Sequence, residues 1–231
     1  ARSLSQAEFE AMFRDEAGAL LAIPAHPNLA GFVTFDVRAK PKPILVMELV
    51  PGPTLERALE LGNLDLVRVL AIIDGIGAGL EAMHAMGVAH LDLKPPNVIL
   101  REGDGPPVLV DFGLAGRSLR PGCGSPHYGA PEVWQETSAS IEPRPTDVYA
   151  YACIAYELLM GEPLVDADSL TGLLALHRGG GAQSRVRTAM GRAPSLASLA
   201  ALLEPALAMD ASKRPTVARL RAGFAAVGPD L

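Results

Sequence analysis

The stretch His90-Leu91-Asp92-Leu93-Lys94-Pro95-Pro96-Asn97 decides the interpretation of this 231-residue chain. It places an acid, a cation and an amide in one loop, directly after a predicted helix. Phosphoryl transfer needs these three functions, because a carboxylate can accept the proton of an attacking hydroxyl, an ammonium can neutralise phosphoryl charge, and an amide can help to hold a metal. We therefore predict that Asp92, Lys94 and Asn97 belong to one phosphotransfer site.

A second carboxylate follows fourteen residues after Asn97, in Asp111-Phe112-Gly113 at the end of a predicted strand. Such a carboxylate can bridge magnesium to the phosphates of a nucleotide, and the glycine gives the backbone freedom to turn. The pattern thus predicts that Asn97 and Asp111 share a metal.

Composition restricts the class of protein. With 49% hydrophobic and 20% charged residues and a formal charge of -6, the chain is typical of a globular protein. Its 26 acidic residues outnumber its 20 Lys and Arg, which argues against a nucleic-acid partner. Cys123 and Cys153 can build neither a disulfide framework nor a zinc site, and a cytoplasmic location fits this usage. The apolar stretch 148–160 is too short for a membrane span and contains Glu157.

Hydrophobic periodicity predicts an α+β organisation, in which a hairpin precedes many helices. Proline or glycine punctuation separates the elements, and Gly179-Gly180-Gly181 is interpreted as a flexible break. The predicted strands are 31–37, 43–49, 98–100 and 108–110; the predicted helices are 5–23, a short one from Thr54, 64–87, 147–160, 169–177, 196–209 and 217–227.

Three further motifs occur in a fixed order. Residues 124–132 end in Ala-Pro-Glu, Asp147-Val148-Tyr149 opens a buried helix, and Lys213-Arg214-Pro215-Thr216 lies near the C-terminus. Together with the two loops above, this order resembles a Hanks-type Ser/Thr protein kinase. The resemblance implies that Asp92 is the catalytic base, that Lys94 contacts the γ-phosphate of ATP, and that Asn97 and Asp111 hold Mg²⁺. It also implies a protein substrate.

The same resemblance assigns structural roles. Asp147 should tie down the catalytic loop, and Glu132 should pair with Arg214. His90 is expected to be a packed scaffold residue rather than a catalytic one. Lys94, together with Ser125 in the place of the usual Thr, favours Ser/Thr rather than Tyr substrates.

The N-terminal part is similar to a partial kinase N-lobe. Glu16 stands at about the family distance from His26-Pro27-Asn28 to be the regulatory-helix glutamate, which contributes to nucleotide binding. Residues 47–50, including Glu48 and Val50, resemble the gatekeeper and hinge, where backbone groups meet adenine. The expected division is therefore a partial N-lobe and hinge over 1–50, with a regulatory helix and a β-hairpin, and a complete, mainly helical C-lobe over 51–231.

The sequence also departs from the family pattern. Leu91 replaces the arginine that ordinarily contacts a phosphorylated activation loop, so we expect activity without loop phosphorylation. No glycine-rich loop or strand lysine precedes Glu16, and the hairpin is expected to expose a strand edge. A missing start is favoured over completion by another chain and over a degenerate kinase. Two alternatives to a protein kinase stay open, namely a pseudokinase or protein-binding module and a small-molecule phosphotransferase.

Overall fold

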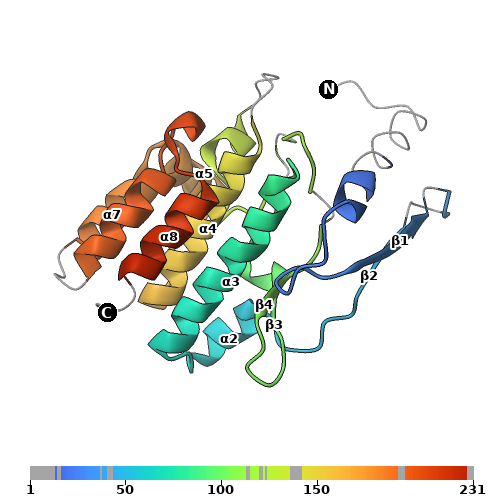
Figure 1. The fold of residues 1–231 in the computed structure, drawn as a ribbon. Helices are drawn as coiled ribbons and strands as arrows, with labels where there is room; N and C mark the ends of the chain where they lie inside the picture. Colours follow the sequence, from blue (N-terminus) through green and yellow to red (C-terminus); the bar gives the residue numbers. More distant parts are fainter. Residues whose placement is uncertain are drawn as a thin grey trace.

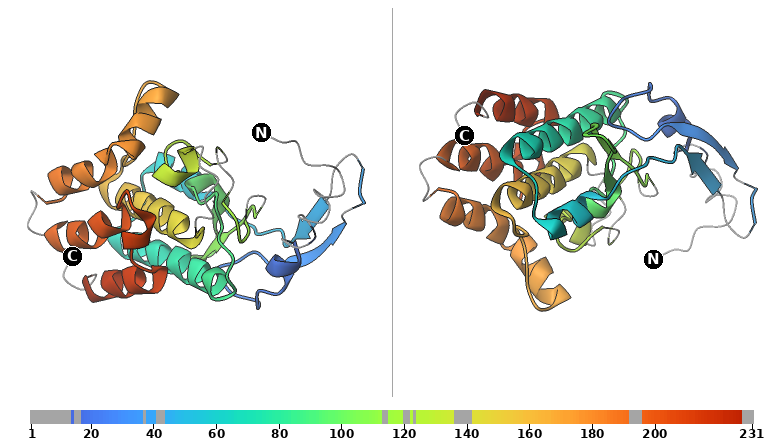
Figure 2. Two further views of the ribbon diagram at one scale, coloured as in Figure 1. Left: turned by 90° about the horizontal axis from the view of Figure 1, so that it is seen from above. Right: turned by 90° about the horizontal axis from the view of Figure 1, so that it is seen from below.

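The computed structural model describes residues 14, 17–36, 38–40, 44–112, 115–119, 122, 124–135, 142–191 and 196–227. Within them the chain is a helical body with two small antiparallel sheets, which confirms the predicted α+β class. Residues 17–21 are helical, in agreement with the end of the predicted first helix. Figure 1 and the two views of Figure 2 show the N-terminal hairpin projecting away from the helical body.

The projecting hairpin consists of β1 (Phe32–Asp36) and β2 (Ile44–Met47), with Phe32 opposite Met47. Among the described residues these two strands form a sheet of their own, so the predicted open edges are present. Val33 is 64% exposed and Ile44 is 50% exposed, which is unusual for the β-branched residues of a strand pair.

Helix α4 (Arg144–Met160) is the centre of the helical body. Every residue from Thr146 to Leu158 is buried, because α3 (Leu66–Ala85) and α7 (Ala197–Ala206) pack against it. α8 (Val217–Val227) packs against both α3 and α7, as Figure 1 shows. The predicted all-round apolar character of this central helix is therefore confirmed.

Shorter elements complete the body. α2 (Leu55–Leu61) begins where the sequence predicts a short helix, and the Thr54 side chain caps its N-terminus. The predicted break at residues 179–181 is confirmed, because α5 (Leu170–Arg178) ends before it and a separate helix, α6 (Gly181–Ala189), follows; its flexibility stays a prediction. Gly180 makes this junction with a left-handed backbone, φ 72°, which glycine adopts without strain. None of the helices that the structure describes combines the length and apolar character that a membrane span requires.

The second sheet positions the predicted site. β3 (Val98–Leu100) pairs with β4 (Pro107–Leu109), and a 3-10 turn, η1 (Pro95–Asn97), leads into β3. The segment between the hairpin and α2 lies along β3, since the N–H of Leu100 donates to the carbonyl of Pro53. A side chain at Gly52 would collide with the Leu100 carbonyl oxygen, so this close approach requires glycine.

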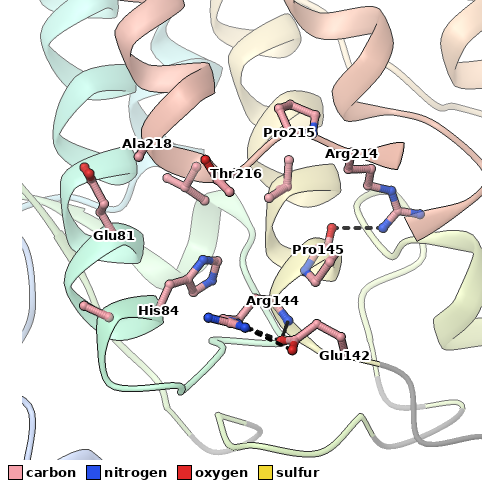
Figure 3. A pocket seen from close by; sticks show the side chains of 12 residues that line it. Glu81, His84, Glu142, Arg144, Pro145, Arg214, Pro215, Thr216 and Ala218 are labelled. Atoms are coloured by element: carbon pink, nitrogen blue, oxygen red, sulfur yellow. Dashed lines mark hydrogen bonds and ion pairs between the residues drawn. The ribbon is translucent and has the colours of Figure 1, made fainter. Parts of the chain in front are cut away.

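A buried ion pair joins the 3-10 turn η2 (Pro131–Trp134) to the segment before α8. Arg214 donates to both carboxylate oxygens of Glu132 at 2.7 and 2.8 Å, which confirms the predicted pairing. Arg214 also donates to the carbonyls of Pro145 and Ala208, each at 2.9 Å, and its guanidinium lies 5.0 Å from the centre of the Tyr149 ring. The contact with Pro145 is drawn in Figure 3. The pair thus fixes three chain segments at one point.

We predict that Arg214→Lys lowers the free energy of unfolding by about 2–4 kcal/mol, because an ammonium cannot reproduce the two-pronged contact with Glu132 and leaves buried acceptors unpaired. Arg221→Lys is the matched control. Arg221 makes a similar two-pronged contact with Asp74, but its side chain is 35% exposed, so the expected loss is about 1 kcal/mol or less. Urea denaturation measures the free energy of unfolding of both variants. Equal losses of this free energy would contradict the assignment of Arg214 as a structural anchor.

Candidate active site

The loop between α3 and β3 brings the three predicted groups together. The Lys94 ammonium lies 2.8 Å from Oδ2 of Asp92. The side-chain amide of Asn97 donates to the Asp92 carbonyl at 2.9 Å and to Asp92 Oδ2 at 3.2 Å. The Asp92 side chain is 13% exposed and that of Lys94 is 26% exposed, so both remain within reach of a substrate.

The orientation of Asn97 is set by these contacts. Its NH₂ group faces Asp92, and an amide binds a cation only through its oxygen, so Oδ1 is the atom that could ligate a metal. Its backbone carbonyl accepts the N–H of Val110 at 3.0 Å, which places Asn97 directly beside the residue before Asp111.

Asp111 is exposed and has a left-handed backbone with φ 59°. A non-glycine residue in this region carries strain that the surrounding structure must hold in place. The backbone hydrogen bond between Asn97 and Val110 places Asn97 beside the neighbour of Asp111, although the two metal-binding candidates are fourteen positions apart in the sequence.

The next residue, Phe112, links the site to the N-terminal hairpin. Its ring lies 5.0 Å from that of Phe32 on β1 and 5.3 Å from that of His90, measured between centroids. His90 is buried, which lowers its pKa, and its Nε2 lies 3.1 Å from the Val110 carbonyl. These contacts agree with the prediction that His90 is a scaffold residue. Gly113 lies outside the described residues.

Asp147 holds the catalytic loop, as the resemblance implies. One carboxylate oxygen accepts the N–H of His90 at 2.7 Å and the other accepts the N–H of Leu91 at 2.8 Å. The helix predicted over residues 147–160 begins earlier, at Arg144, so Asp147 lies in the first turn of α4. Leu91 has φ 64°, so these two bonds stabilise an otherwise unfavourable backbone.

His84 is a third partner of Asp147 that the sequence does not reveal. Its Nε2 lies 2.8 Å from Oδ2 of Asp147. It also lines a cavity of about 360 Å³ between α3, α4 and the start of α8, which Figure 3 shows. This cavity contains none of the predicted catalytic residues, so it is separate from the candidate active site.

The segment 124–129 covers the other side of Asp92. The Ser125 hydroxyl donates to Oδ1 of Asp92 at 3.0 Å. The Tyr128 hydroxyl donates to Glu157 at 2.7 Å, and burial raises the pKa of both groups. The Ser125 and Tyr128 hydroxyls are thus engaged inside the protein, whereas Ser118 is exposed.

A groove of about 470 Å³ opens beside these residues. It is lined by Lys94, residues 95–96 and residues 125–128, and also by Glu56 and Glu157. The groove runs from the predicted catalytic loop to the segment that Ser125 anchors. Its position suits the part of a substrate that flanks the reacting hydroxyl.

The predicted adenine-binding residues lie where the hairpin leaves β2. The Glu48 N–H donates to the Gly31 carbonyl at 2.7 Å, so this N–H is already used within the sheet. Its carboxylate contacts Arg101 at 2.9 Å, which lowers the pKa of Glu48. Val50 is buried, with 8% exposure. Glu16 lies outside the described residues.

Comparison with known proteins agrees with this geometry. The family model described as the protein kinase domain matches residues 2–222. The serine/threonine-protein kinase PkaA of Streptomyces coelicolor is 36% identical over 187 residues, which cover 75% of this chain and 33% of that protein. PknD of Mycobacterium tuberculosis is 34% identical over 189 residues, covering 78% of this chain and 27% of PknD.

A third relative, the serine/threonine-protein kinase PknH of Mycobacterium bovis, is 37% identical over 141 residues, or 58% of this chain and 23% of PknH. The aligned part of the chain spans only about a quarter to a third of the length of these curated relatives. The ordered motifs, the loop geometry and the family match agree. The chain therefore belongs to the protein kinase domain family, as a Ser/Thr kinase domain of the Hanks type.

Proposed function

We propose that the protein transfers the γ-phosphate of ATP to a Ser or Thr hydroxyl of a protein substrate. The observation that carries the proposal is the meeting of three groups at one carboxylate. Lys94 and Asn97 contact Oδ2 of Asp92, and Ser125 contacts Oδ1. A cation, an amide and an anchor of the substrate-facing segment thus converge where a phosphotransfer site needs them.

In the proposed reaction Asp92 orients the substrate hydroxyl and accepts its proton. The hydroxyl oxygen bonds to the γ-phosphorus while the bond from that phosphorus to the bridging oxygen of ADP breaks, and ADP leaves. Lys94, 2.8 Å from Asp92, offsets negative charge on the transferred group. Ser125 and Asn97 hold the Asp92 carboxylate in position from its two sides.

Asn97 and Asp111 suit magnesium, which prefers oxygen ligands and binds proteins through one or two carboxylates together with substrate phosphates. In the described part of the chain no cluster of three or more His, Cys, Asp or Glu could hold a metal by itself. A nucleotide-bound ion fits this ligand supply better than a protein-only site. When bound, Mg²⁺ would neutralise charge on the β- and γ-phosphates.

The adenine ring would lie at the hinge, against Val50 and the backbone carbonyl of Glu48. Glu16 would contribute to nucleotide binding as the regulatory-helix glutamate, which pairs with a strand lysine in the family pattern.

We predict that Asp92→Asn in the full-length protein lowers kcat by about 10²–10⁴-fold, because an amide cannot accept the hydroxyl proton. The KM for ATP should hardly change, since Asp92 does not bind the nucleotide in this scheme.

Asp111→Asn should instead abolish magnesium-dependent ATP binding. Phosphate transfer from labelled ATP to a protein acceptor and calorimetric nucleotide binding measure the two effects.

Asp104→Asn is the control for Asp111→Asn. Asp104 is an exposed turn residue with φ 58°, almost the backbone conformation of Asp111, but it lies in the β3–β4 connection and away from Asp92. The Asp104→Asn variant should keep both phosphate transfer and magnesium-dependent ATP binding. Transfer by the Asp92→Asn variant at the parental rate would refute the role of the base, and parental ATP binding without any transfer would favour the binding-module alternative.

We further propose that transfer does not require a phosphorylated activation loop. Leu91 stands where the phosphate-binding arginine is expected, its side chain is 6% exposed, and its N–H is held by Asp147. Phosphatase treatment of the active full-length protein is therefore expected to leave the transfer rate unchanged. Loss of activity on treatment, restored by rephosphorylation, would refute this proposal.

A further inference from the structure

His177 is a buried histidine that connects three parts of the molecule. It lies in the last turn of α5 with 0% exposure. Its Nδ1 is 2.7 Å from the Tyr149 hydroxyl on α4, and its Nε2 is 2.8 Å from the backbone carbonyl of Pro126. Neither partner lies in the loop 90–97, and His177 takes no part in the proposed reaction.

The partners of the ring determine its protonation state. The Pro126 carbonyl can only accept, so Nε2 must carry the hydrogen. In a neutral ring Nδ1 is then an acceptor, and the Tyr149 hydroxyl donates to it. This arrangement satisfies both ring nitrogens without a charge. Burial lowers the pKa of His177 to about 4, which agrees with a neutral imidazole at neutral pH.

The carbonyl that His177 holds lies next to the residue that touches the catalytic carboxylate. Ser125 donates to Asp92, and the Ser125 carbonyl accepts the N–H groups of Tyr128 and Gly129 at 3.1 and 2.8 Å. The turn over residues 125–129 is thus closed by its own hydrogen bonds and is fastened to α5 through Pro126. Residues 125–128 also line the groove of about 470 Å³ beside Lys94.

Tyr149, the other partner of His177, is packed into the buried core. The Tyr149 ring lies beneath the guanidinium of Arg214, which is itself bound to Glu132. A second contact of α5 reaches the same region, since Arg178 donates to the Trp134 carbonyl. His177 therefore connects the buried core, through Tyr149, to residues 125–129.

We propose that His177 is a positioning residue for protein-substrate recognition: its Nε2–H holds the Pro126 carbonyl and thereby keeps residues 125–129 in the form that receives the substrate chain. The inference rests on the proposed kinase function and deepens it. It assigns part of the protein-substrate affinity to a side chain that touches neither ATP nor the reacting hydroxyl.

Two amide substitutions separate the two contacts of the ring. The polar atoms of Asn occupy about the place of Nδ1, so His177→Asn should keep the contact with Tyr149 and lose the one with Pro126. The amide nitrogen of Gln occupies about the place of Nε2, so His177→Gln should restore a donor to Pro126. Tyr149→Phe removes only the hydroxyl, and Thr171→Ala changes an exposed position of the same helix.

In steady-state phosphorylation of a protein acceptor, His177→Asn should raise the KM for the acceptor by about 3- to 10-fold, the effect of one lost hydrogen bond. The KM for ATP should stay constant. His177→Gln should recover most of the loss, Tyr149→Phe should have a smaller effect than His177→Asn, and Thr171→Ala should have none. An unchanged acceptor KM in folded His177→Asn, or an equal rise in the KM for ATP, would overturn the proposal.

Two measurements that need no catalysis test the positioning role of His177 independently of the proposed kinase function. Amide hydrogen exchange of Tyr128 and Gly129 should accelerate in His177→Asn and return towards the parental rate in His177→Gln. The imidazole ¹⁵N shifts of the parental protein should show the Nε2–H form at neutral pH. Parental exchange rates in His177→Asn, or an Nδ1–H ring, would refute the positioning role whether or not the protein transfers phosphate. Absence of transfer with these two results as expected would refute only the kinase function.

Discussion

The buried carboxylate of Asp147 is the interaction on which the site depends. It accepts the N–H groups of His90 and Leu91, and His84 contacts the same oxygen as His90. Because Asp147 is 1% exposed and lies on the most buried helix, the catalytic loop is attached to the rigid centre of the molecule. Leu91 can keep its left-handed backbone only while these bonds persist. The position of Asp92, one residue later, follows from this attachment.

The strand β4 connects the N-terminal part to the same loop. Leu109 exchanges hydrogen bonds with Asn28 and Ala30 on one side, and Val110 donates to Asn97 on the other. The ring of Phe112 then reaches Phe32 on β1. The residues proposed to bind magnesium therefore lie at the junction between the hairpin and the helical body. A nucleotide bound there would touch both the hairpin and the helical body.

Sequence reasoning succeeds where local pattern and ordered motifs coincide. The buried helix α4, the start of α2 at Thr54 and the pair Glu132 and Arg214 are all predicted, the pair because two short motifs keep a known relationship across distant positions. The division at residue 50 and the role of Glu16 stay predictions. Residues that belong to no ordered motif and act only through tertiary contacts are not predicted. His84 and His177 have no informative spacing, and only the structure shows what their ring nitrogens touch.

We propose that Asp92, Asn97 and Asp111 meet around one magnesium-bound nucleotide. A crystal structure of the full-length protein with Mg²⁺ and a non-hydrolysable ATP analogue tests this proposal most directly. We expect a metal ion about 2.1 Å from both Asn97 Oδ1 and an Asp111 carboxylate oxygen, with the γ-phosphate facing Asp92. A nucleotide bound elsewhere, or a metal that neither side chain ligates, would contradict it.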